Sequence, residues 1–230
     1  MQMIAPPPDK TTTAKNRIFL VDDHEMFREG LRQLIEREPD MTVCGDAADA
    51  TAALAGIETS TPDLVIVDIS LGGTSGIDLI KTIKSKYEDL PVLVVSMHEE
   101  SLYSERALRA GAMGYVMKHE PSKTVKTAIR KVLEGDLFLS QKMAGSMVAK
   151  LMRGNNEQFS SPLETLSDRE LQVFRMLGQG MAVRLIAEEM SVTIPTVNSF
   201  RNRIKEKLNL KSSTEVMLKA IQWVQDQTPL

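Results

Sequence analysis

The chain has 230 residues, of which 42% are hydrophobic and 26% charged, and its formal net charge at pH 7 is -3. This is the composition of a globular protein of one or two domains, and it excludes fibrous and wholly disordered classes. The single cysteine, Cys44, excludes an internal disulfide and any metal cluster built on several cysteines.

The first 16 residues precede every predicted element. They contain Pro6–Pro8 and Thr11–Thr13 and lack the apolar segment of a signal peptide. No stretch of the chain reaches the length that spans a membrane. The sequence therefore predicts a disordered lead-in over residues 1–16 and a cytoplasmic protein that does not contact membranes.

Residues 17–134 alternate between short apolar runs and amphipathic segments. The runs predict strands over Arg17–Val21, Thr42–Gly45, Asp63–Val67, Pro91–Val95 and Met113–Met117. The amphipathic segments predict helices over Glu25–Arg37, Asp49–Glu58, Gly76–Lys86, Ser101–Ala110 and Ser122–Leu133. Five strand–helix units with short connections predict a doubly wound, five-stranded parallel sheet of the flavodoxin-like α/β class, with helices on both faces.

After residue 134 the alternation ends. Residues 135–162 are predicted to form a linker with a helix over Lys142–Arg153, and residues 163–230 contain only helical patterns. Ser167 is predicted to cap a helix that ends at Leu177. The helices that follow are predicted over Val183–Met190 and Pro195–Leu208, and from the capping residue Ser212 to Gln225. Two short helices joined by a tight turn indicate an all-α helix-turn-helix domain.

Polar side chains stand at the ends of the predicted strands. Asp22 and Asp23 follow the first, Asp68 the third, Ser96 the fourth and Lys118 the fifth. The carboxyl ends of parallel strands meet at one sheet edge, so these groups should converge. Carboxylates that hold a divalent cation, an ammonium group and a hydroxyl donor are what a phosphoryl-accepting aspartate requires. Asp68 is the predicted acceptor.

The helical domain carries a local excess of positive charge. Residues 193–211 hold five basic side chains against one acidic side chain, although the whole chain is acidic. Four of the five lie on the second helix of the predicted helix-turn-helix motif, which would enter the major groove of DNA. This distribution favours phosphate contacts over an ordinary solvated helix face.

At these motifs the chain resembles a bacterial two-component response regulator of the NarL/FixJ group, with a receiver domain over residues 17–134 and a LuxR-type helix-turn-helix DNA-binding domain over residues 163–230. The resemblance covers Val21–His24, Phe27–Leu31, Asp63–Asp68, Gly111–Tyr115 and Lys118, and then Leu166–Glu170, Ile186–Glu188, Thr196-Val197 and Ile204–Leu208. It implies that a sensor histidine kinase phosphorylates Asp68 and that Asp22, Asp23, Asp68 and the Ser70 carbonyl hold Mg²⁺, Asp22 mainly through water. Lys118 and Ser96 would contact the phosphoryl group, and Ser96 would draw the switch residue Tyr115 inward.

The resemblance also implies that the chain binds double-stranded DNA, and acts as a dimeric switch rather than an enzyme. The implied DNA-binding residues are Thr196, Asn198, Ser199, Arg201, Asn202, Arg203 and Lys205. The last helix would pair two chains through Met217, Ile221 and Val224. Its apolar surface exceeds what a small domain buries on one side of a helix.

Several residues depart from the family pattern. Asn198 and Phe200 stand where relatives often carry lysine and histidine, and Val183 and Leu185 replace positions that are usually polar and acidic. One interpretation is that Leu185 and Phe200 pack on each other, and it is the favoured one. The other is that they form an apolar surface for a second protein.

Two other functional classes remain open. A phosphatase with Asp22 as nucleophile would require a second acid two residues later, where His24 stands. A regulator that acts through protein contacts, without phosphorylation, would use Val183, Leu185 and Phe200 as its surface. Comparing DNA binding with and without modification of Asp68 distinguishes this class from the phosphorylation-controlled one.

Overall fold

The computed structural model describes residues 15–71, 74–97, 100–141, 143–145, 148 and 162–227. The predicted lead-in lies almost wholly outside these residues, as does most of the predicted linker helix over Lys142–Arg153. Elsewhere the predicted helices and strands are confirmed, with ends that differ by no more than two residues. None of the helices in the described ranges is long and apolar enough to cross a membrane.

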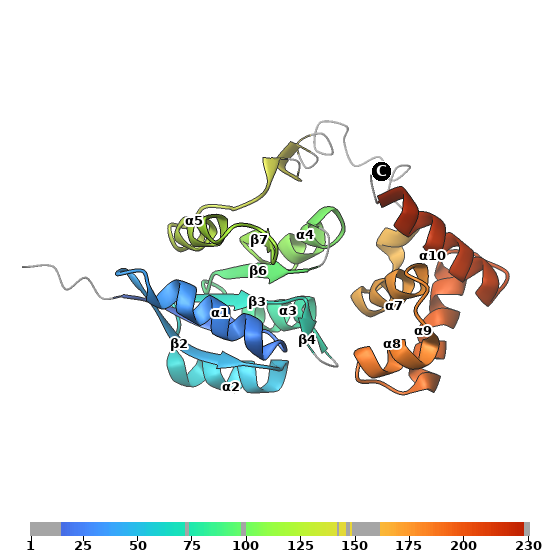
Figure 1. The fold of residues 1–230 in the computed structure, drawn as a ribbon, viewed down its shortest axis with the longest axis horizontal. Helices are drawn as coiled ribbons and strands as arrows, with labels where there is room; N and C mark the ends of the chain where they lie inside the picture. Colours follow the sequence, from blue (N-terminus) through green and yellow to red (C-terminus); the bar gives the residue numbers. More distant parts are fainter. Residues whose placement is uncertain are drawn as a thin grey trace, which may run out of the picture.

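Residues 16–133 form the predicted doubly wound fold (Figure 1). The parallel sheet has the strand order β2-β1-β3-β6-β7. Its strands are β1 (Asn16–Val21), β2 (Met41–Ala47), β3 (Leu64–Val67), β6 (Val92–Ser96) and β7 (Gly114–Met117). The helices are α1 (Glu25–Glu36), α2 (Ala50–Ser60), α3 (Gly76–Lys86), α4 (Glu100–Arg109) and α5 (Ser122–Leu133). A short hairpin, β4 (Ser70–Leu71) and β5 (Thr74–Ser75), follows β3.

The helices cover the sheet on both faces. One cluster of buried side chains joins α1 and α5 to one face, and a second joins α2, α3 and α4 to the other. Each of the four residues of β3 is buried, since successive side chains point to opposite covered faces. This explains why the third strand reads as a continuous apolar run.

The chain after α5 adds to the edge of the sheet. Phe138 makes an isolated parallel bridge with Gly114 in β7. Its backbone nitrogen donates to the carbonyl of Met113 at 2.9 Å, and its carbonyl accepts from the nitrogen of Tyr115 at 3.1 Å. The segment that leaves the receiver domain is therefore tied to the strand that carries Tyr115.

The second domain consists of helices. It contains η2 (Pro162–Thr165), α7 (Asp168–Gly178), α8 (Val183–Glu189), α9 (Ile194–Lys207) and α10 (Ser213–Gln227). Ser167 and Glu170 form the predicted capping box at the start of α7. Thr193 caps α9, and Ser191 takes a positive φ of 51° in the turn between α8 and α9. These local signals end one helix and begin the next, as a helix-turn-helix motif requires.

The two domains lie side by side, with α7 and α8 on the side that faces the receiver domain and α10 beyond them (Figure 1). The buried cluster over α2, α3 and α4 continues into the helical domain and includes Leu163, Leu166 and Phe174. Polar contacts between α4 and the start of α7 accompany this apolar contact.

Candidate phosphorylation site and nucleic-acid interface

The predicted site residues meet at the carboxyl edge of the sheet. Backbone hydrogen bonds align the strand ends there: the nitrogen of Asp68 donates to the carbonyl of Val21, and the nitrogen of Lys118 to the carbonyl of Ser96, each at 2.8 Å. Asp68 and Ser96 are buried, with 3% and 0% exposure. The strand topology therefore brings together chemical groups that are far apart in sequence.

Asp68 is held by a donor on each oxygen. Ser96 Oγ donates to Oδ1 at 2.6 Å, and Lys118 Nζ donates to Oδ2 at 2.7 Å. The Lys118 ammonium also lies 4.4 Å from the ring centroid of Phe27 on α1, within cation–π range. An oxyanion at this position therefore has a hydroxyl donor and a fixed cation already oriented towards it.

Asp22 lies beside Asp68 and shares the same cation. Lys118 Nζ is 2.5 Å from its Oδ2. Burial raises the pKa of the Asp22 carboxyl, and the nearby charge of Asp68 raises it further, while Lys118 opposes both effects. Two carboxylates with one ammonium between them remain short of positive charge, so a divalent cation would be stabilised here.

Oxygen ligands for such a cation are present. Ligand atoms of Asp22, Asp23, His24 and Asp68 all lie within 4.8 Å of one another, and Ser70 lines the same cavity. Carboxylate and carbonyl oxygens are the ligands that Mg²⁺ prefers. His24 Nδ1 lies 2.8 Å from an oxygen of Asp23, and His24 lines the same cavity.

The contacts of two residues of α1 were not found from the sequence. Phe27 covers the Lys118 ammonium, and Arg28 donates to the backbone carbonyl of Asp22 at 2.6 Å and to Asp46 at 3.0 Å. Both side chains belong to the motif Phe27–Leu31, which was recognised only as a resemblance. The sequence signal for these contacts was the short distance along the chain from Asp22 to this motif. One turn of α1 places Phe27 and Arg28 over the end of β1.

Tyr115 differs from the expected switch. The resemblance implied an inward movement when Ser96 turns to a phosphoryl group, yet Tyr115 is already only 2% exposed beside unmodified Asp68. Burial raises the pKa of its hydroxyl well above the usual value, and a hydrogen bond with Ser96 partly opposes this. Tyr115 therefore has no exposed position from which to move inward in this structure, because its contact with Ser96 is already made.

A glycine in a loop usually suggests flexibility, but Gly76 is needed for close packing. A Cβ at this position would lie 2.0 Å from the backbone oxygen of Asp68. The residue therefore permits close packing of α3 against the acceptor residue itself.

The residues of α9 that are predicted to bind DNA are partly open to solvent. Asn198, Ser199, Asn202 and Arg203 are exposed. Thr196, Arg201 and Lys205 are half-buried. Arg201 donates to the side-chain oxygen of Asn198 at 3.2 Å. The most exposed members of the predicted set are thus available to a second molecule.

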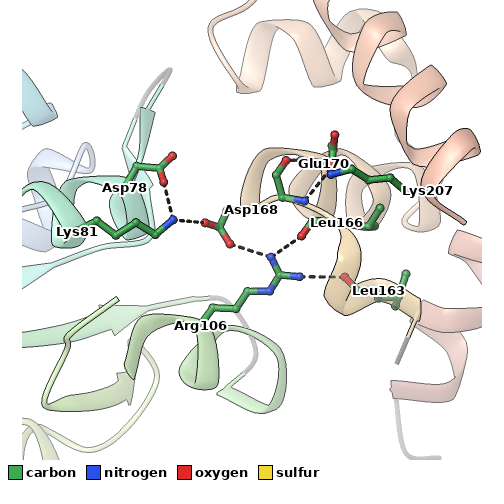
Figure 2. Close-up of polar contacts among 9 residues, drawn as sticks. Asp78, Lys81, Arg106, Leu163, Leu166, Asp168, Glu170 and Lys207 are labelled. Atoms are coloured by element: carbon green, nitrogen blue, oxygen red, sulfur yellow. Dashed lines mark hydrogen bonds and ion pairs between the residues drawn. The ribbon is translucent and has the colours of Figure 1, made fainter. Parts of the chain in front are cut away.

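Lys207, considered above as one of the basic side chains of this helix, contacts α7, although its side chain is 40% exposed. Its Nζ lies 2.7 Å from the carboxylate of Glu170, which is 2% exposed (Figure 2). Burial raises the pKa of Glu170, but the hydrogen bonds from Lys207 and Ser167 outweigh burial and lower it overall. Lys207 joins α9 to α7 and is committed to a structural contact.

The residues of α10 predicted for a dimer surface differ in exposure. Met217 is 41% exposed and Ile221 is half-buried. Val224, by contrast, packs on Gly178 of α7, where an added Cβ would lie 2.6 Å from its Cγ2. Val224 is half-buried like Ile221, so the side chain is accessible in part and its place in a dimer surface stays a prediction.

The expected Leu185–Phe200 pair is not buried. Leu185 is 47% exposed, whereas Phe200 is half-buried and packs against the main cluster. The packing interpretation is wrong for Leu185, since a side chain that keeps half its surface in water does not fill a core position.

The fold and the site define a protein with a receiver-type phosphoacceptor domain joined to a helix-turn-helix domain. The family model for the response regulator receiver domain matches residues 18–130, and that for bacterial regulatory proteins of the luxR family matches residues 164–220. The chain belongs to the two-component response regulators of the NarL/FixJ family, whose members include DNA-binding regulators of transcription.

Two curated relatives match over most of their length. The oxygen regulatory protein NreC of Staphylococcus carnosus is 32% identical over 205 residues, which cover 87% of this chain and 94% of that protein. The response regulator UvrY of Escherichia coli is 32% identical over 204 residues, covering 89% and 93%.

Solved structures agree in fold. A LuxR-family response regulator from Aurantimonas, at 36% identity, covers 60% of this chain and 99% of that chain with a TM-score of 0.56. RcsB from Salmonella typhimurium, at 22% identity, covers 90% and 98% with a TM-score of 0.62.

Proposed function

We propose that this chain is a phosphorylation-controlled regulator of transcription in which a sensor histidine kinase phosphorylates Asp68. The observation that carries the proposal is the pair of donors on its carboxylate, Ser96 and Lys118. In the transfer, an Asp68 oxygen forms a bond to phosphorus, the bond from phosphorus to the kinase imidazole breaks, and that nitrogen keeps the electron pair. Lys118 then contacts the phosphoryl oxygens and Ser96 donates to one of them.

Asp22, Asp23, Asp68 and the Ser70 carbonyl would hold Mg²⁺. When bound, the ion would offset negative charge on the phosphoryl oxygens. The chemistry of this oxygen-rich group supports the assignment, because the cluster holds three carboxylates and a single nearby ammonium. Asp22 binds Lys118 directly, so its contribution to an ion through water leaves that ion pair in place.

Incubation with acetyl phosphate and Mg²⁺ tests the acceptor. Intact mass should rise by one phosphoryl group in the wild type and in the control Asp78→Asn, which changes an exposed acid on α3. Asp68→Asn should show no gain. Full labelling of Asp68→Asn would move the acceptor to another residue and overturn the proposal.

The second half of the proposed function is DNA binding by α9. The exposed residues Asn198, Ser199, Asn202 and Arg203, with Thr196, Arg201 and Lys205 at their edges, support it. Asn198 can pair with adenine through two hydrogen bonds, and Arg203 can contact phosphate. Because its target is DNA, we place the protein in the cytoplasm and describe it as a switch rather than an enzyme.

Salt dependence tests the phosphate contact. Binding of the full chain to a mixed-sequence duplex should weaken steeply as salt rises. Arg203→Gln should make the slope of log affinity against log salt shallower by about one unit. The control Lys219→Gln removes an exposed charge on α10 and should leave the slope unchanged. Equal slopes for the wild type and both variants would contradict the assignment of Arg203.

A homodimer is the proposed active state, with α10 as the contact. The exposed side chain of Met217 and the half-buried side chains of Ile221 and Val224 support this surface. Phosphorylation of Asp68 would alter dimerisation and thereby DNA binding.

A further inference from the structure

The first turns of α9 carry no charged side chain. Residues 191–200 contain neither acids nor bases, and the first cation along this helix is Arg201. The N-terminal residues of a reading helix are the ones that reach base edges, and arginine and lysine are the side chains that read guanine there. The part of α9 that a helix-turn-helix domain presents to the bases therefore lacks a guanine reader.

Two asparagines offer a different kind of readout. Asn198 and Asn202 are exposed and lie four residues apart on α9, so they share one side of the helix. One helical turn separates them by about 6 Å along the axis, which is close to two base steps of about 3.4 Å each. Both amides can therefore reach base pairs in the same major groove that are no more than two steps apart.

Arg201 fixes the orientation of the first amide. Its Nη1 donates to Oδ1 of Asn198 at 3.2 Å, and its Nε is buried, so the guanidinium lies back against the domain. A guanidinium can only donate hydrogen bonds, so Asn198 must turn its oxygen towards Arg201 and its amino group away. The oxygen has a second lone pair, which can accept from a base.

This orientation matches adenine. In the major groove adenine presents the N6 amino donor and the N7 acceptor, which an asparagine pairs with through its oxygen and its amino group. Guanine presents two acceptors at the same edge, so it would leave the Asn198 oxygen without a donor. We propose that Asn198 and Asn202 read adenine in the target DNA, and that Arg201 is a positioning residue that holds the Asn198 amide for this contact.

Selection of duplexes from a random pool tests the readout. The full chain is first treated with acetyl phosphate and Mg²⁺. Adenine should be enriched at two positions no more than two steps apart in each half-site. Replacing one of these adenines by 7-deazaadenine removes the N7 acceptor and leaves the Watson–Crick pair intact. The affinity of the wild type should then fall by about fivefold, the expected scale for one hydrogen bond.

Variants assign each contact. Each of the two adenines should lose its sensitivity to this replacement in one of the variants Asn198→Ala and Asn202→Ala, because no amide remains to donate to N7. The control Gln222→Ala removes an exposed amide from α10 and should keep the fivefold fall. Emission of Trp223, which packs on Phe174, checks that each helical domain is folded.

The role of Arg201 has its own measurement. Arg201→Met keeps the length of the side chain but removes its donors, and it should reduce the fall at the Asn198 adenine to about twofold without changing the salt dependence. A direct phosphate contact would instead make the slope of log affinity against log salt shallower by about one unit. That shallower slope, with the fivefold fall retained, would overturn the positioning role.

Two further results would contradict the adenine readout. One is a fivefold fall that persists at both adenines in Asn198→Ala and Asn202→Ala. The other is enrichment of guanine in place of adenine, with that preference lost in Arg201→Met, which would make Arg201 the base reader. The inference rests on the proposed function, and the two fail differently: absence of salt-dependent binding to any duplex in every protein would refute DNA binding by α9 itself.

Discussion

At the residue scale, Lys118 balances the charge of two buried carboxylates. Its side chain is 5% exposed and is the cation shared by Asp22 and Asp68, which are equally buried. The pKa of Asp22 is raised by burial and by Asp68. Ionisation of this carboxyl therefore lowers the free energy of unfolding, and that loss is complete once pH has risen through its folded pKa. The ammonium offsets this cost at neutral pH.

Lys118→Met should therefore destabilise the receiver domain by about 3–5 kcal/mol at pH 7 without divalent cations, as loss of one partner from a buried charge pair does. Urea unfolding followed by circular dichroism measures it. Adding Asp22→Asn to the variant should recover part of the loss, and Lys86→Met, at an exposed lysine, should have little effect. A loss under about 1 kcal/mol would mean that the carboxylates behave as exposed ones do.

The exposure of Leu185 reverses an expectation from the sequence. Leu185→Ala should change stability by no more than about 0.5 kcal/mol, as surface substitutions do. Phe200→Ala should cost about 1–3 kcal/mol, because its half-buried ring packs against the cluster. Trp223 packs on Phe174 at a centroid distance of 5.8 Å, so its fluorescence in urea reports unfolding of this domain. Large and coupled losses at both sites would restore the paired interpretation.

At the element scale, the Glu170–Lys207 contact connects two helices. Glu170 closes the capping box at the start of α7 and also accepts from Lys207 near the end of α9. A buried acid in the first turn of α7 is thus connected to the last turn of α9. The same acid lies two residues after Asp168, which carries the contact to the receiver domain.

Lys207→Gln should destabilise the helical domain by about 1–3 kcal/mol at pH 7, since it leaves a buried carboxylate short of a charged donor. The folded pKa of Glu170 is below the ordinary glutamate value of 4.5, so its stabilising contribution is present above that pH and lost as pH falls through the folded pKa. The difference between variant and wild type should therefore shrink well below pH 4.5. Trp223 fluorescence in urea measures it. A pH-independent difference would contradict the assignment, as would an equal loss in the exposed-site control Lys219→Gln.

At the scale of the whole molecule, the contact between domains and the contact between chains use different helices. The helical domain meets the receiver domain through the start of α7, while the exposed side of α10 lies beyond it (Figure 1). The contact between the domains therefore leaves Met217 and Leu218 accessible, with 41% and 61% exposure. The two contacts can form in the same chain.

Met217→Lys should weaken dimerisation of the phosphorylated protein by about tenfold, because it places a charge at the centre of an apolar contact. Analytical ultracentrifugation measures the dimer, and Trp223 emission should stay unchanged. Val224→Lys should destabilise the domain as well, since one side of Val224 packs on Gly178. Gln222→Lys, at an exposed position of α10, serves as the control. Undiminished dimerisation of Met217→Lys would place the dimer surface elsewhere.

The architecture, and the sheet edge at which the candidate site residues lie, could be predicted from the amino-acid pattern. Apolar runs such as Leu64–Val67 specify buried strands, and capping residues such as Ser167 begin helices, because both signals act within a few residues. Parallel strands end at a common edge, so the topology alone brought Asp68, Ser96 and Lys118 together. Their distances follow from strand register, which the hydrophobic pattern sets.

The contacts of the helical side chains, by contrast, were seen only in the three-dimensional structure. Lys207 turned to Glu170, Val224 to Gly178, and Arg106 to an acid 62 residues away. None of these follows from local pattern, because the packing angle and phase of a helix depend on how the side chains of separate elements fit together. A chain's periodicity specifies that a helix buries one face, but the neighbours of that face are chosen by close packing of the whole molecule.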